Sequence, residues 1–127
     1  GGVAAFVDAW EAQPLFASQE RADAASRSAQ RALRLGHDAE GLARSLEELG
    51  LARMPDHRPA LAAAASTLPI TLVTGQDDAR FGAIAASLAA AIPTLSLARI
   101  AGAGHNPLLE APASLAALLC GLDLVPS

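Results

Sequence analysis

Residues 68–81, LPITLVTGQDDARF, predict the fold of this 127-residue chain. The run that ends at Gly75 is short, apolar and rich in β-branched residues, which is typical of a strand buried on both faces. A helical pattern follows at 80–92, a second strand-like run at 94–100, and a closing helix at 111–122. This alternation of strands and helices indicates the open parallel sheet of an α/β fold.

The first half of the chain has a different character, because residues 1 to about 66 show helical periodicity. Ser18 is expected to cap the N-terminus of one helix, and Asp38 that of the next. The expected helical stretches are 3–12, 18–33, 38–49 and 59–66.

Composition narrows the classes of function that are open. The 52% hydrophobic content is sufficient for a core, and the net charge of −4 argues against a nucleic-acid-binding surface. All nine basic residues are arginine, so Schiff-base chemistry through a lysine of this chain is excluded. Arginine also suits the forked recognition of carboxylates.

Cys120 and the first residues bear on the cellular compartment. A single cysteine cannot form an internal disulfide, and its apolar neighbours in LLCGL predict a buried structural thiol. No apolar run reaches the roughly 18 residues of a membrane span. The opening GGVAAFVDAW also lacks the basic leader of a secretory signal. We therefore expect a soluble cytoplasmic protein without a membrane partner.

Two loops beyond the expected strands carry the candidate catalytic side chains. Asp77 and Asp78 follow the first strand, and His105 follows the second. In an open parallel sheet the carboxyl ends of neighbouring strands meet at one edge, where functional groups gather. An aspartate there could accept the Nδ1 proton of the histidine, which leaves the other ring nitrogen free to take a proton from a serine.

Each of these side chains also has a structural interpretation. A loop aspartate after a strand is usually a turn former or a helix cap, and a single loop histidine is usually without a special role. Their occurrence together, acid first and histidine second, favours catalysis, because one known triad follows the chain order Ser, Asp, His. Arg80, beside the acids, could cap the helix or line the site.

The stretches LPITLVTGQDDARF and LARIAGAGHNPLLEAP together resemble the last third of an α/β-hydrolase. In that family the acid stands three residues after the glycine that ends the strand. Counting from Gly75, the resemblance implies Asp78 as the acid and leaves Asp77 as a turn residue. The general base of the family corresponds to His105 in GAGH, and Glu110 belongs to the pattern that follows it.

The helical half narrows the resemblance to one branch of that family. FVDAWEAQPLFAS and residues 31–61 are similar to the cap of 2-succinyl-6-hydroxy-2,4-cyclohexadiene-1-carboxylate synthases, which act in menaquinone (vitamin K2) biosynthesis. The WxxQPLFAS pattern is far more selective than the loops around the acid and the histidine. The resemblance implies a helical cap segment at 1–54 and the C-terminal part of the α/β-hydrolase core at 55–127.

The resemblance implies a lyase, which removes a proton from a cyclohexene substrate and expels pyruvate from its enolpyruvyl ether. A triad serine, activated by His105 and Asp78, would act as the base, without a metal or an organic cofactor. Because the substrate is a polyanion, the resemblance implies that Arg34 binds a carboxylate. It also implies that Trp10 and Phe16 are aromatic walls of the pocket.

Each of these three residues also has a structural explanation that needs no substrate. Trp10 and Phe16 lie at positions where packing alone would place an aromatic ring. Arg34 ends a helix, where the helix dipole favours a cation in any case. The arginines expected on the solvated surface are Arg21, Arg27, Arg31 and Arg44.

The chain departs from the family pattern at two points. Leu108 stands where many members carry a polar residue or a histidine, which concerns the polarity of the pocket. None of the nine serines lies in a G-x-S-x-G nucleophile elbow. The nucleophile, the oxyanion-hole donors and further arginines are therefore expected before Gly1, and this chain alone is expected to be inactive.

The expected sheet supports the same interpretation. Two parallel strands leave open edges, and a two-stranded sheet is marginal in water. We therefore expect the C-terminal half of a longer protein, partnered by the missing N-terminal half of the same fold. Two other interpretations remain open: a different α/β-hydrolase, such as an esterase or C–C hydrolase, and a non-catalytic truncated paralogue.

Overall fold

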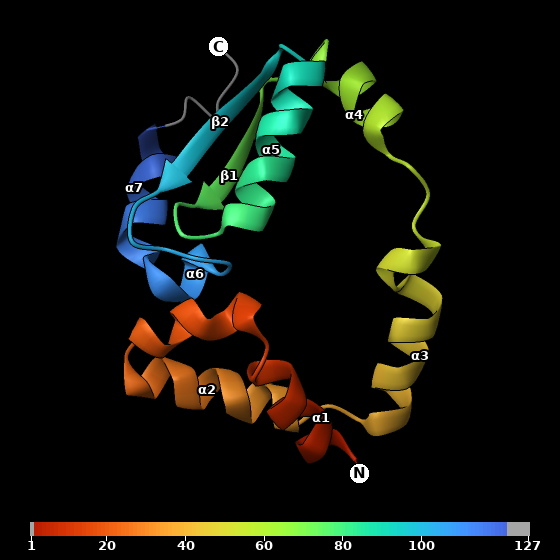
Figure 1. Ribbon diagram of the computed structural model, residues 1–127, viewed down its shortest axis with the longest axis vertical. Coiled ribbons are helices and arrows are strands. Elements are labelled where there is room, and N and C mark those ends of the chain that lie inside the picture. Colours follow the sequence, from red (N-terminus) through yellow and green to blue (C-terminus); the bar gives the residue numbers. More distant parts are fainter. Residues whose placement is uncertain (1, 122–127) are drawn as a thin grey trace.

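The computed structural model describes residues 2–121. It contains a helical segment, residues 3–53, and a two-stranded parallel sheet that lies on one side of it (Figure 1). Both strands run toward the helical segment, so the loops that follow them lie between the sheet and those helices. The helical elements before the sheet are α1 (Val3–Glu11), the 3₁₀ helix η1 (Pro14–Arg21), α2 (Ala24–Leu35), α3 (Ala39–Leu49), the 3₁₀ turn η2 (Leu51–Arg53) and α4 (Arg58–Ala65). The remaining elements are β1 (Ile70–Gly75), α5 (Ala79–Ala91), β2 (Leu95–Ile100), α6 (Pro107–Glu110) and α7 (Pro112–Gly121).

The expectation that Ser18 caps a helix is wrong. Ser18 lies within η1, and α2 begins only after Asp23, whose extended backbone interrupts the helical path. The Asp23 side chain caps α2 by accepting a hydrogen bond from the Ser26 N–H at 2.9 Å. The Ser18 hydroxyl donates instead to Glu110, a partner 92 residues away that no local pattern indicates. Asp38 caps α3 as predicted.

The two strands pair in parallel, from Ile70 opposite Leu95 to Gly75 opposite Ile100. The prediction of strands buried on both faces is wrong for the described residues. β1 is half-buried along most of its length, and several β2 side chains, including that of Leu97, are exposed. The reason is that α5 packs on the pair, but among residues 2–121 too little of the chain lies against the sheet to bury both of its faces. Each strand also keeps one edge without a neighbouring strand among these residues.

A small apolar core packs α4 and α5 against the sheet. Its buried centre consists of Ala65, Ile92 and Leu95, from α4, the end of α5 and the start of β2. Removing this apolar surface from water is the main favourable contribution to packing. The half-buried residues around the centre are Leu61, Ile70, Leu72, Leu88 and Ala89.

Cys120 is exposed, so the prediction of a buried thiol is wrong. The half-buried residues of α7 include Leu115 and Leu118. Because the residues of one helix face recur every three or four positions, Cys120 lies on a different side of α7 from these leucines. Neither α7 nor any other helix within residues 2–121 is long and apolar enough to cross a membrane.

Gly75 allows the two strand ends to approach each other closely. A Cβ atom at this position would collide with the backbone oxygens of Ala103 and Gly104, in the loop after β2. That loop is held against the end of β1, since the Asp77 N–H donates to the Ala103 carbonyl at 2.9 Å. The glycine therefore brings the two loops that carry the candidate catalytic residues into contact.

We expect Gly75→Ala to destabilise the protein by about 1–3 kcal/mol, because the added methyl group forces the strand ends apart. Gly82→Ala is the matched control within α5, where the nearest atom to an added Cβ is in the flexible Arg99 side chain at 3.7 Å. The control is expected to be neutral or slightly stabilising. Denaturant unfolding of the complete gene product that contains these residues measures both changes. Equal effects of the two substitutions would contradict this account.

Candidate active site

Asp78 uses its two carboxylate oxygens for two different contacts. Oδ1 accepts a hydrogen bond from the Phe81 N–H at 3.0 Å and so caps the N-terminus of α5. Oδ2 lies 2.8 Å from Nδ1 of His105, and only 5% of the Asp78 side chain is exposed. The cap restricts the rotamer of the side chain, which aims the second oxygen at the imidazole.

His105 is presented by the loop after β2. Gly102 takes a positive φ of 71° in this loop, a conformation that favours glycine. Because an ionised carboxylate only accepts hydrogen bonds, Nδ1 of His105 donates to Asp78, and Nε2 is left as the nitrogen that can accept a proton. The predicted proximity of acid and histidine is present in the structure. The catalytic roles of the two residues remain predictions.

Asp77 is not the partner of His105. Its carboxylate pairs with Arg21 of η1, at 2.5 Å between Oδ2 and Nη2, and both side chains are largely exposed. The family resemblance, counted from Gly75, implies this division between the two neighbouring acids. Arg80 does not cap α5, since Asp78 does, but it lines the cavity beside the histidine.

Two aromatic rings contact the imidazole. The centroid of Phe81 lies 4.7 Å from that of His105, and the centroid of Phe16 lies 5.7 Å from it. Phe16 also packs against Trp10 at 5.3 Å, so both predicted aromatic residues belong to a chain of rings that leads to His105. Phe81 was not among the predicted site residues. The available signal was its position three residues after Asp78, where a capping acid meets a backbone N–H.

His105 borders two cavities of different size. One, of about 670 Å³, lies between η1 and the two strand-end loops. The other, of about 110 Å³, lies at the carboxyl end of β1 beside Val73 and Thr74. Neither Trp10 nor Arg34 lines these two cavities, so the structure does not bring them into direct contact with the imidazole.

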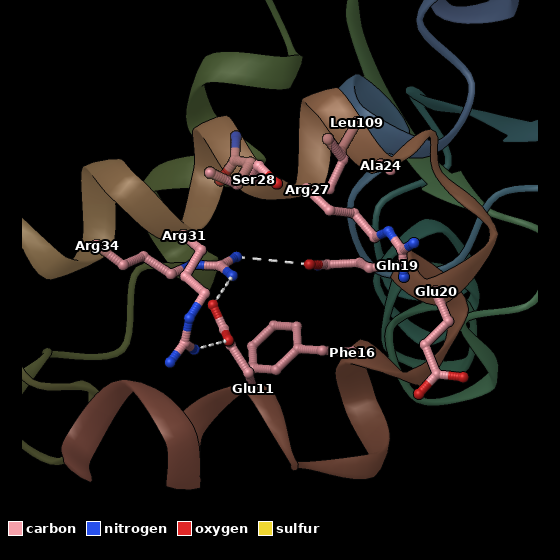
Figure 2. A pocket seen from close by; sticks show the side chains of 11 residues that line it. Glu11, Phe16, Gln19, Glu20, Ala24, Arg27, Ser28, Arg31, Arg34 and Leu109 are labelled. Atoms are coloured by element: carbon pink, nitrogen blue, oxygen red, sulfur yellow. Dashed lines mark hydrogen bonds and ion pairs between the residues drawn. The ribbon is translucent and has the colours of Figure 1, made fainter. Parts of the chain in front are cut away.

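Arg34 lines a separate cavity of about 360 Å³ that α2 forms with η1 and the end of α1 (Figure 2). Its guanidinium donates to Glu11 at 2.9 Å and to Gln19 at 3.4 Å. Arg31 donates to the other carboxylate oxygen of Glu11. Phe16 lines the same cavity and connects it with the imidazole.

Two of the arginines expected to be solvated make specific ion pairs, but only Arg31 departs from that expectation, because Arg21 is exposed as predicted. Arg31 is half-buried and pairs with Glu11, and Arg21 pairs with Asp77. These partners lie 20 and 56 residues away along the chain, so helical spacing alone did not indicate them. The other two arginines, Arg27 and Arg44, are exposed as expected.

The ion pairs in this cavity shift the pKa values of Glu11 and Arg31. Burial raises the pKa of Glu11, but the hydrogen bonds from Arg34 and Arg31 outweigh it and hold the pKa below its ordinary value of 4.5. The hydrogen bonds from Arg31 to Asp8 and Glu11 raise the pKa of Arg31. At neutral pH the Glu11 carboxylate therefore lies between two guanidinium groups in this cavity, which Glu20 and Arg27 also line.

Glu110 is a second buried carboxylate near the histidine, and it was not among the predicted site residues. Its side chain is only 1% exposed and accepts hydrogen bonds from the backbone on either side of His105. The only earlier signal was its place in the family pattern after the histidine. Within residues 2–121, no group of three or more His, Cys, Asp and Glu side chains could hold a metal ion.

The chain is similar to proteins named 2-succinyl-6-hydroxy-2,4-cyclohexadiene-1-carboxylate synthase. It is 39% identical to that of Enterobacter sp. (strain 638) over 111 residues, which cover 87% of this chain and 39% of that protein. It is 40% identical to that of Citrobacter koseri over 106 residues, which cover 84% of this chain and 38% of that protein. The chain thus spans about two fifths of the length of these curated relatives. No family model matches the chain.

Among solved structures, MenH from S. aureus superposes on 96% of this chain with a TM-score of 0.89 and 28% sequence identity. The superposition covers 45% of that chain. Because nearly all of this chain is matched, the likeness includes both the helical segment and the sheet. The architecture is that of the C-terminal part of an α/β-hydrolase fold, as the sequence predicts.

We expect the contribution of Glu11 to stability to depend on pH. Because its pKa is lowered in the folded protein, the ion pairs with Arg31 and Arg34 stabilise the fold above the ordinary pKa of 4.5, and this contribution is lost as pH falls through the lowered pKa. Thermal unfolding should show Glu11→Gln less stable than the parent at neutral pH, with a difference that closes on acidification. Glu48→Gln, at an exposed position of α3, is the control. A difference that persists in acid would contradict the expectation.

Proposed function

We propose that this chain, which belongs to the α/β-hydrolase superfamily, supplies the acid and the base of a Ser-Asp-His triad in a pyruvate-eliminating lyase. The substrate is an enolpyruvyl cyclohexene carboxylate, and the product is 2-succinyl-6-hydroxy-2,4-cyclohexadiene-1-carboxylate, an intermediate of menaquinone biosynthesis. The observation that carries the proposal is the hydrogen bond between His105 and the buried Asp78, at 2.8 Å. The similarity to synthases of that name supports the choice of reaction.

The elimination needs a base and a route for one proton. In the proposal, a serine outside this chain gives its proton to Nε2 of His105 and then removes a proton from a ring carbon of the substrate. The electron pair of that C–H bond forms a new C=C bond, while the C–O bond to the enolpyruvyl group breaks. The enolate of pyruvate leaves and takes up a proton from the imidazolium, which restores the starting charge of the histidine.

Asp78 has two functions in this scheme. It fixes the tautomer of His105 through Nδ1, and it stabilises the imidazolium that forms when Nε2 takes up the proton. The carboxylate is buried and its other oxygen is occupied by the cap of α5, so it cannot easily turn away. The rings of Phe16 and Phe81 cover part of the imidazole, and the low exposure of the Asp78 carboxylate strengthens its electrostatic interaction with the ring.

The proposal assigns the nucleophilic serine to polypeptide outside this chain. Ser18 lines the larger cavity beside His105, but its hydroxyl donates to Glu110, and it lies in no nucleophile elbow. Among the described residues, β1 has one unpaired edge, and the cavity of about 110 Å³ lies at its carboxyl end. A further strand on that edge would bring its own loop to this cavity, and there the proposal places the hydroxyl.

The proposal assigns one carboxylate of the substrate to Arg34, with Trp10 and Phe16 as aromatic walls. Arg34 already donates to Glu11 and Gln19, so a substrate carboxylate would replace Glu11 on the guanidinium fork. Phe16 supports this assignment, because it lines the cavity of Arg34 and also contacts the imidazole. A bound substrate could therefore extend from the arginine to the triad along this ring.

The test is an assay of the complete gene product with the enolpyruvyl substrate, in which the release of pyruvate is followed by its reduction to lactate. We expect pyruvate release and no cleavage of simple esters. Asp78→Asn should lower kcat by about 10³–10⁴-fold, because the histidine loses its orienting acid. Asp77→Asn is the matched control, since the Asp77 carboxylate pairs with Arg21 and not with His105, and this substitution should change kcat little.

Two outcomes would contradict the proposal. Ester cleavage without pyruvate release would favour an esterase. A large loss of kcat in Asp77→Asn with none in Asp78→Asn would overturn the assignment of the acid.

The same assay separates substrate binding, measured by KM, from the chemical step, measured by kcat. We expect Arg34→Lys to raise KM by about tenfold at little change in kcat, because a lysine cannot hold a carboxylate with a bidentate fork.

A further inference from the structure

We propose that Glu110 is a positioning residue, which holds the loop of His105 in place and connects it to η1 in the helical segment. Glu110 touches neither the imidazole nor a reacting atom in the described contacts, so it would act through the backbone. The consequence of this positioning for catalysis rests on the proposed function. The positioning itself does not, because it concerns the geometry of one loop.

The contacts of Glu110 enclose the histidine from both sides. Oε2 accepts a hydrogen bond from the Gly104 N–H at 2.7 Å, and Oε1 accepts one from the Asn106 N–H at 3.0 Å. These two residues are the immediate neighbours of His105 in the chain. With both flanking amides bound to one carboxylate, the Cα position of the histidine is fixed relative to α6.

A carboxylate suits this position because every group that faces it is a donor. Besides the two amides, the Ser18 hydroxyl donates to Oε1 at 3.0 Å, and Nη2 of Arg21 lies 3.9 Å from Oε2. The side chain is almost completely buried, and a buried carboxylate is stable only where such partners replace water. Glutamine has the same shape, but its amide nitrogen would face an N–H donor and leave it unsatisfied.

The position of Gly104 shows how closely these segments are packed. A Cβ atom there would collide with the Ser18 side chain and come within 3.2 Å of Glu110. The loop therefore has no room for a side chain at Gly104, where it passes Ser18 and the carboxylate. Small changes at the carboxylate are expected to move the backbone of the loop itself.

The contact with Ser18 joins the loop of His105 to η1, and η1 also carries Phe16, whose ring contacts the imidazole. Arg21, at the end of η1, adds an ion pair to Asp77 in the loop after β1. The carboxylate of Glu110 thus lies where the helical segment meets both strand-end loops. A change in the position of η1 would be transmitted to the histidine through it.

The experiment measures the Nδ1 proton of His105 by proton NMR in the complete gene product. In the parent protein this proton should give a downfield signal, because it is held between the imidazole and Asp78 and exchanges slowly. Glu110→Gln should shift or broaden the signal. It should also lower kcat by about 10- to 100-fold with little change in KM, since a misplacement of the base affects chemistry more than binding.

Ser18→Ala is the second variant, because it removes one donor to Glu110 and leaves both backbone contacts. It should alter the signal in the same direction and by less. Glu48→Gln, at the exposed surface of α3, controls for the loss of one negative charge. Circular dichroism and thermal unfolding establish that each variant is folded, and if Glu110→Gln does not fold, the result of Ser18→Ala decides the question.

The proposal would be overturned if folded Glu110→Gln had the Nδ1 signal and the kcat of the parent. If only Ser18→Ala folds, an unchanged Nδ1 signal in that variant would overturn it. Failure of the proposed function is recognised separately. In that case the parent releases no pyruvate, while its Nδ1 signal still responds to Glu110→Gln. Rescue of the signal by Glu110→Asp, which keeps the charge, would further support a positioning carboxylate.

Discussion

The hydrogen bond between Asp78 and His105 is the interaction on which the rest of the site depends. It joins two residues that are 27 positions apart in the chain, and it exists because two parallel strands end at the same edge of a sheet. Gly75 makes the approach possible, since any side chain at its position would push the second loop away. The capping of α5 by the same aspartate then leaves a single oxygen to face the imidazole, so the fold and the site share one side chain.

Two carboxylates thus hold the histidine through different contacts. Asp78 contacts the ring directly, and Glu110 binds the backbone on both sides of it. The helical segment takes part in this arrangement through Ser18 and through Phe16, which packs against the ring. The candidate site is consequently formed at the contact between the two halves of the chain, and neither half contains all of it.

The sequence predicts the parts of the structure that arise from local patterns. The strand ending at Gly75 and the helix capped by Asp38 follow from periodicity and capping, whereas the choice of Asp78 over Asp77 came from the family resemblance. The predictions that are wrong concern the burial of side chains and their partners far away in the sequence. Ser18 has the chemistry of a cap but is bonded across the molecule, and Arg31 looks like a surface residue because its partners lie on another helix. Cys120 lies among apolar residues, yet the helix turns it outward.

A high-resolution crystal structure of the complete gene product is the most direct test of the central claim. We expect a carboxylate oxygen of Asp78 within hydrogen-bonding distance of Nδ1 of His105, at about the present 2.8 Å, and a serine hydroxyl on the side of Nε2. A structure in which the two side chains point apart, or in which Asp77 takes the place of Asp78 at the ring, would contradict it.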